Sequence, residues 1–214
     1  MKGYAVTFCR GRKGCPNAAV DDAADLEARV AAVVERHHAA RFAPEERDGV
    51  LPNHRTVKIA VSCCPNGCSQ PQIADVGFLG ARRPMLTSQP CADCAQCAKR
   101  CQERAIVMRT DAVGPVLDFE KCVACGQCID VCPTGTLGEG ARGWRIQFGG
   151  KLGRHPRLAE EVGGIHSAAE CAAFLDCALA FHAERATRGE RLSTLLDRAE
   201  AAAAFRVRCV EGED

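Results

Sequence analysis

Twelve of the sixteen cysteines in this chain of 214 residues fall at spacings typical of metal-bound thiolates. Two runs share one spacing, in which gaps of two, two and three residues separate four cysteines. The runs are Cys91, Cys94, Cys97 and Cys101, and then Cys122, Cys125, Cys128 and Cys132, which Pro133 follows. Short gaps let one loop place three thiolates around a [4Fe–4S] cube, and the fourth thiolate of each run binds the other run's cluster. The two runs therefore predict a pair of iron–sulfur clusters.

This crosswise arrangement divides the eight cysteines into two ligand sets. Set A consists of Cys91, Cys94, Cys97 and Cys132, and set B consists of Cys101, Cys122, Cys125 and Cys128. Zinc is the alternative, because cysteine pairs two residues apart also suit a tetrahedral zinc site. Two identical runs with three closely spaced cysteines favour clusters over zinc. We interpret this region as a two-cluster ferredoxin module.

Four further cysteines form a different group, which we call the outer set. They are Cys9, Cys15, Cys64 and Cys68. Each pair lies in a turn containing Pro and either Gly or Asn, directly after a strand candidate, so the two loops can meet at the ends of neighbouring strands. Four thiolates suffice for one more cubane. The alternative is four structural thiols, since a free cysteine is commonly a buried hydrophobic residue.

The elements that position these thiols are predicted from hydrophobic periodicity. Strands are expected at residues 4–8, 57–61, 115–118 and 144–148, and helices at 21–41, 167–187 and 190–204. Asp21 and Asp22 can cap the first helix. The cysteine runs interrupt this α/β pattern. We therefore expect a first domain part at 1–83, a ferredoxin-like insert at 84–138 and a completing part with C-terminal helices at 139–214.

Composition limits the possible functions. Apolar residues make up 47% of the chain and charged residues 26%, with a net charge of +1, so nothing indicates nucleic-acid binding. No segment approaches the about 20 consecutive apolar residues of a membrane helix, and the first residues do not form a signal peptide. We expect a reducing cytoplasm without membrane insertion, where disulfides are rare.

The outer cysteines and three later segments resemble the sirohaem domain of sulfite and nitrite reductases. The resemblance rests on the Cys64–Cys68 motif CPNGC with residues 73–77 after it, and on residues 149–158 and 189–192. A ferredoxin insert between such segments is similar to the dissimilatory and anaerobic sulfite reductase subunits. The resemblance covers nearly the whole chain. It implies an α+β fold, in which an α/β sirohaem-type half-domain carries the insert and ends in a helical tail.

The resemblance also implies the chemistry. The outer set would hold a third [4Fe–4S] cluster, and Cys68 would join that cluster to the iron of sirohaem. Electrons would enter through the insert and drive the six-electron reduction of a small anion, sulfite in preference to nitrite. Besides the cysteines, the residues expected to bind the cofactors are Asn66, Lys151 and Arg154, and those expected to act in catalysis with Cys68 are Arg10, Arg12 and Lys13. The more common interpretation of each basic residue alone is a solvated surface charge, and only the group as a whole indicates anion binding.

Relatives of full size carry a ferredoxin-like half-domain before the first cysteine motif, whereas eight residues precede Cys9 here. We therefore expect a homo-oligomer or heteromer in which a second chain completes the sirohaem pocket, together with an electron-donor protein. One alternative is an electron-transfer subunit with no substrate site of its own. Another is a redox or iron sensor.

Four cysteines are left over. Cys63, Cys171, Cys177 and Cys209 are expected to be free thiols in the core or on the surface. Cys63 is a competing ligand for the outer cluster, but the turn that follows favours Cys64.

Overall fold

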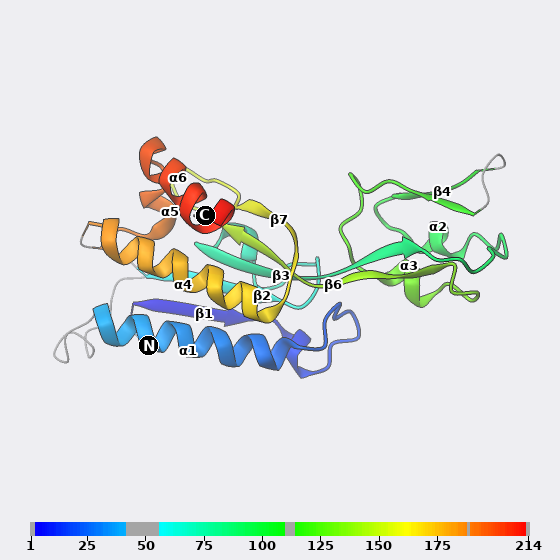
Figure 1. Ribbon diagram of the computed structural model, residues 1–214, viewed down its shortest axis with the longest axis horizontal. Coiled ribbons are helices and arrows are strands. Elements are labelled where there is room, and N and C mark those ends of the chain that lie inside the picture. Colours follow the sequence, from blue (N-terminus) through cyan, green and yellow to red (C-terminus); the bar gives the residue numbers. More distant parts are fainter. Residues whose placement is uncertain (1–2, 42–55, 110–113, 188, 213–214) are drawn as a thin grey trace.

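The computed structural model describes residues 3–41, 56–109, 114–187 and 189–212, and its centre is a five-stranded sheet (Figure 1). The strands are β1 (Tyr4–Phe8), β2 (Val57–Ser62), β3 (Val76–Leu86), β6 (Leu137–Phe148) and β7 (Glu160–His166), and the sheet has the order β1-β2-β3-β6-β7. The first three strands are parallel, and β6 and β7 join them in antiparallel pairs. The fold is thus mixed α+β, as expected.

Two long helices cover one face of this sheet. Helix α1 (Ala23–Arg41) and helix α4 (Ala168–Arg185) lie side by side against it. Leu26 of α1, Phe78 of β3 and Leu175 of α4 are fully buried in the shared core. The residues that face these helices alternate along β2, as Val57, Ile59 and Val61, while β2 and the first half of β3 are buried almost continuously.

The start of α1 is fastened to β6 by its acidic residues. The carboxylate of Asp22 accepts a hydrogen bond from the indole Nε1 of Trp144 at 3.1 Å. Asp21 forms an ion pair with Arg142 at 2.6 Å. The two residues expected to cap the helix therefore link it to the sheet.

Strands β3 and β6 extend beyond the core as a two-stranded ribbon that carries the cysteine-rich insert. The insert contains α2 (Gln96–Arg100), β4 (Ile106–Met108), β5 (Pro115–Leu117) and α3 (Gln127–Asp130). It has a small core of its own, made by Cys97, Ile106, Cys128 and Leu137. The expected domain boundaries at 83/84 and 138/139 fall inside these two strands.

Most of the expected elements are present, but β4 and the short helices α2 and α3 of the insert were not predicted, and there are further differences. The helix expected at 190–204 is wrong, because the structure splits it into α5 (Leu192–Leu195) and α6 (Ala199–Phe205), followed by a π-helical turn at Arg206–Gly212. Strands β3 and β7 were not predicted, and β6 begins seven residues earlier than expected at 144. No helix in the described ranges is long and apolar enough to span a membrane.

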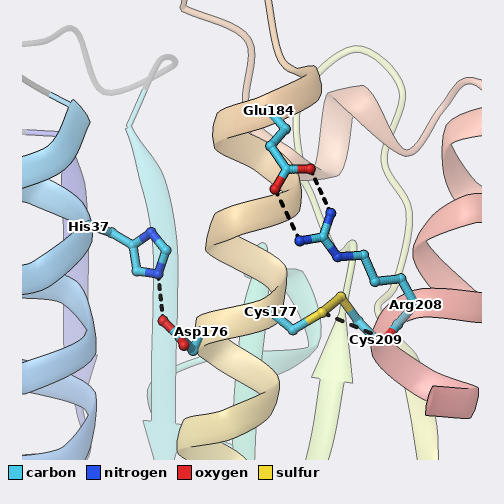
Figure 2. Close-up of a disulfide and its surroundings, with 6 residues drawn as sticks. All are labelled: His37, Asp176, Cys177, Glu184, Arg208 and Cys209. Carbon is cyan, nitrogen blue, oxygen red and sulfur yellow. Dashed lines mark hydrogen bonds and ion pairs between the residues drawn. A yellow bond between two sulfur atoms is a disulfide. The ribbon is translucent and has the colours of Figure 1, made fainter. Parts of the chain in front are cut away.

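The expectation that Cys177 and Cys209 are free thiols is wrong. Cys177 of α4 and Cys209 of the C-terminal turn form a disulfide with Cα atoms 5.8 Å apart (Figure 2). The two residues are brought together because the C-terminal turn folds back along α4, where Arg208 also pairs with Glu184 at 2.6 Å. Cys171 remains a free thiol that is fully buried in the core, as expected.

Candidate iron–sulfur sites

The outer thiols gather at one edge of the sheet because β1 and β2 are parallel neighbours. Phe8 at the end of β1 lies opposite Val61 near the end of β2, so the loops that follow both strands emerge together. The Sγ atom of Cys9 accepts hydrogen bonds from the backbone amides of Gly11 and Cys63, both at 3.2 Å. The bond from Cys63 joins the Cys9 loop to the residue directly before Cys64.

The second loop brings Cys64 and Cys68 to the same place. The side-chain amide of Asn66 donates a hydrogen bond to the Sγ atom of Cys68 at 3.0 Å, and Cys68 is exposed. Burial raises the pKa of the Cys64 thiol, although a backbone hydrogen bond from Asn66 opposes the rise. The neighbouring thiols that raise this pKa further are those of Cys68, Cys9 and Cys15. All four outer thiols are therefore close enough to interact electrostatically.

The insert thiols form two groups that combine both sequence runs. One cavity wall contains Cys91, Cys94, Cys97 and Cys132, which are the members of set A. A separate cavity of about 380 Å³ is lined by Cys101, Cys122, Cys125 and Cys128, which are the members of set B. In each group one thiol is the fourth cysteine of the other run. Cys132 joins the first three cysteines of the first run, and Cys101 joins the first three of the second run. The fold thus brings the eight thiols together crosswise.

Electrostatic interactions within the insert follow the same grouping. Burial raises the pKa of Cys128 to about 12, and the nearby thiols of Cys125, Cys122 and Cys101 contribute to the rise. Burial likewise raises the pKa of Cys97, with contributions from Cys132 and Cys91. Because cluster binding needs thiolates, raised pKa values mean that cluster assembly releases protons.

In the part of the chain that the structure describes, no three His, Cys, Asp or Glu side chains gather closely enough to hold a single metal ion. A [4Fe–4S] cube is larger than one ion and is bound by thiolates at its corners. The sets are therefore defined by the cavities that their thiols surround and by their mutual electrostatic interactions.

The cavity of set B also reaches the outer set. Its wall includes Cys64, Pro65 and Asn66 beside the insert cysteines. The loop that carries Cys64 and the set B loops thus face each other across this cavity of about 380 Å³.

A second large cavity opens beside Cys68, on the side of the sheet that includes Ala5, Thr7 and Ala60. Its volume is about 740 Å³, which is within the range of cofactor pockets. Two basic residues, Lys58 and Arg191, belong to its wall. An exposed thiol and two cations therefore adjoin a space large enough for a large anionic cofactor.

The expected basic residues are placed unevenly. Arg10, Lys13 and Arg154 are exposed, and the side chain of Arg12 lies outside the described residues. Lys151 is largely buried and forms an ion pair with Asp197. Lys151 therefore already has an anionic partner within the chain, and it does not line either of the two large cavities.

Sequence reasoning missed the buried pair of Asp75 and Arg191. The carboxylate of Asp75 is fully buried and accepts hydrogen bonds from Arg191 at 2.6 Å and from the backbone amides of Lys58 and Ser193. It thereby holds Arg191 at the cavity beside Cys68. Asp75 belongs to the segment 73–77 on which the resemblance rests, but its partner lies 116 residues away and no local pattern joins them.

Known proteins are similar to this chain over most of its length. Residues 4–207 match the family described as "Nitrite and sulphite reductase 4Fe-4S domain". The coenzyme F420-dependent sulfite reductase of Methanocaldococcus jannaschii is 32% identical over 200 residues, which are 91% of this chain and 29% of that protein. One subunit of the anaerobic sulfite reductase of Salmonella typhimurium is 32% identical over 57 residues, or 27% of this chain and 17% of that subunit.

A solved structure has the same fold. The crystal structure of dissimilatory sulfite reductase I superposes with a TM-score of 0.59 at 16% identity and covers 98% of this chain and 54% of that chain. The chain thus spans less than a third of the methanogen protein and about half of the solved one.

Proposed function

This chain belongs to the nitrite and sulphite reductase 4Fe-4S domain family, and from that premise we propose that it is the iron–sulfur part of a sulfite-reducing enzyme, with nitrite as the second candidate substrate. The observation that carries the proposal is the meeting of Cys9, Cys15, Cys64 and Cys68 at the ends of β1 and β2, with Cys68 exposed beside a cavity of about 740 Å³.

We assign three [4Fe–4S] clusters to the three thiol sets. Backbone amides donate to cysteine sulfur in each of them, from Gly11 to Cys9, from Asp93 to Cys91 at 3.4 Å and from Ala105 to Cys101 at 3.3 Å. Such bonds favour the thiolate and tune the reduction potential of a cluster. Three sets of this kind support the assignment over twelve unrelated structural thiols.

The residues beside Cys68 fit sirohaem, the second cofactor that the family implies. When bound, sirohaem supplies an iron centre that takes the anion and the electrons needed to reduce it. Cys68 would hold that iron together with the outer cluster, and the bond from Asn66 would keep its sulfur oriented. Lys58 in the cavity wall would pair with a carboxylate of the macrocycle, whereas Arg191 is already paired with Asp75. Arg154, which is exposed, remains a candidate for the same role.

The anion needs positive charge and protons at its own site. Arg10 and Lys13 are exposed in the loop that carries Cys9 and Cys15, so they can attract an anion that approaches the outer set. We propose these two residues, with Arg12 between them, as the substrate-binding cations.

The electron path follows from the shared cavity. Electrons would enter at set A, pass to set B and cross to the outer cluster where Cys64 and the set B cysteines line one space. A second chain, either another copy or a different subunit, would complete the cavity beside Cys68. The open side of that cavity supports this arrangement.

The second candidate function is an electron-transfer subunit without a substrate site. The open side of the cavity beside Cys68 favours it as well, because one chain supplies only part of a cofactor pocket there.

Replacement of Cys68 separates the two functions. In Cys68→Ser, prepared as the full chain with its clusters and sirohaem, we expect loss of the electronic coupling between sirohaem and the outer cluster and loss of sulfite reduction by a reduced viologen dye. Arg29→Met, which removes an exposed ion pair with Asp25 on α1, is the control and should keep both. Retention of coupling and activity in Cys68→Ser would refute the reductase assignment.

A further inference from the structure

One edge of β3 contacts two loops. We call them the outer loop, which carries Cys64 and Cys68, and the set B loop, which carries Cys122 and Cys125. Near its start β3 pairs with β2, and the last pair joins Leu79 to Ser62, directly before Cys63 and Cys64. Three residues further on, Arg82 forms a parallel bridge with Cys125 of set B, and its backbone amide donates to the carbonyl oxygen of Ala124 at 2.7 Å. Because β6 occupies the other edge at Arg82, Cys125 takes up the edge that β2 leaves.

This shared edge of β3 fixes the spacing between the loop that carries Cys64 and the loop that carries Cys125. Three residues of a strand span about 10 Å. The outer loop is pressed onto the edge at Gly80, where an added Cβ would lie 2.4 Å from the carbonyl oxygen of Cys63. The set B loop is pressed onto it at Gly126, where an added Cβ would lie 2.8 Å from Cδ of Arg82. Both loops are thus in direct contact with the same short segment of β3.

The side chain of Arg82 fastens the set B loop to the ribbon. Its guanidinium pairs with Asp130 at the end of α3 and with Glu139 of β6, both at 2.6 Å. The arginine side chain is only 18% exposed, and it lies against the backbone of Gly126, the residue before α3. Helix α3 carries Cys128, so one residue ties a cluster-binding helix to both strands of the ribbon.

We propose that Arg82 is a positioning residue that fixes the distance between the set B cluster and the outer cluster, and so sets the rate at which electrons cross between them. This inference rests on the proposed function, because it needs clusters at both sites. Arg82 is assigned no contact with substrate or cofactor. It acts through the placement of Cys125 and Cys128.

The test compares Arg82→Met with the wild type as the full chain, purified without oxygen with its clusters. Methionine keeps much of the side chain's length but removes both ion pairs. We expect an unchanged iron content, a weakened magnetic coupling between the two clusters in the electron paramagnetic resonance spectrum of the reduced protein, and slower reduction of the outer cluster. Because electron tunnelling slows as the distance between two clusters grows, we expect a lower rate of reduction of the outer cluster than in the wild type.

Two further variants keep the result interpretable. Arg206→Met removes an ion pair with Glu160 outside the insert and should change neither the coupling nor the rate. Asp130→Asn removes only one partner of Arg82 and should give an intermediate effect. Full iron with wild-type coupling and rate in Arg82→Met would overturn the inference, and so would loss of insert iron in both Arg82→Met and Asp130→Asn, which would make Arg82 a folding residue. Failure of the proposed function would appear differently, as a wild-type protein without an outer cluster.

Discussion

Cys63 and Cys64 are adjacent in the chain but have opposite surroundings. The side chain of Cys63 is buried in the hydrophobic core between sheet and helices, and burial raises the pKa of its thiol to about 12, with a further contribution from Cys9. Cys64 lines the cavity that faces set B. Cys63 does not line that cavity, because its side chain is packed in the core. We therefore assign the ligand role to Cys64.

Paired substitutions test this assignment. Cys64→Ser should lose the iron of the outer cluster, about four atoms per chain, and the matching visible absorption. Cys63→Ala should keep the iron and lose only about 1 kcal/mol of unfolding free energy, as is usual for a small change in a core. Iron content and absorption of both purified variants decide the question. A Cys63→Ala protein without the outer cluster, beside a Cys64→Ser protein that keeps it, would reverse the assignment.

For single residues, the sequence was most informative about ligands and least informative about partners. The spacing of the cysteine runs predicted which thiols would meet, since a gap of two or three residues constrains a loop directly. The pairing of Cys177 with Cys209 and the contacts of Arg82 were not predictable, because they join residues 32 and 48 or more positions apart with no local pattern.

Among the elements, the connection from β2 to β3 positions the cavity beside Cys68, and Asp75 organises it. Its backbone amide donates to the carbonyl oxygen of Lys58, and its carbonyl oxygen accepts from Gly149 at 2.8 Å. Its carboxylate holds Arg191 and the start of α5. One residue thus joins β2, the loop before Lys151 and the C-terminal helices.

We predict that Asp75→Asn destabilises the fold strongly. The substitution leaves Arg191, whose side chain is 10% exposed, without a counter-charge, and breaking a buried pair in this way costs about 3–5 kcal/mol. Denaturant unfolding of the cluster-loaded chain measures the loss. Asp176→Asn removes the half-exposed partner of Arg36 and His37 and should cost at most about 1 kcal/mol. Equal losses in the two variants would contradict the role of Asp75.

Elements with a clear period were predicted from the sequence, and those shaped by tertiary contacts were not. Strands β1 and β2 and helix α1 have apolar residues at regular spacing. Strand β3 contains Arg82, Arg83 and Pro84, and its outer half is stabilised by pairing with β6 rather than by burial. The length of β3 was therefore not predictable from the sequence, although its outer half forms the ribbon that carries the insert.

In the molecule as a whole, one continuous ribbon connects the core sheet to the insert, so the three thiol sets belong to a single framework (Figure 1). Set B and the outer set face a common cavity, and the outer set adjoins the cavity beside Cys68. This order of sites supports the proposed passage of electrons from the insert toward Cys68. The α+β fold class was implied by the resemblance to the sulfite and nitrite reductases, whereas the contact between insert and core needed the structure.

The proposed reductase requires that the outer set hold a third cluster joined to sirohaem. The visible spectrum and iron content of the full chain, purified without oxygen from a host that makes sirohaem, test this requirement. We predict tetrapyrrole bands at the red end together with more than about twelve irons per chain, the number that three cubanes contain. About twelve irons without tetrapyrrole would contradict the catalytic role and leave an electron carrier, and about eight irons would contradict the outer cluster itself.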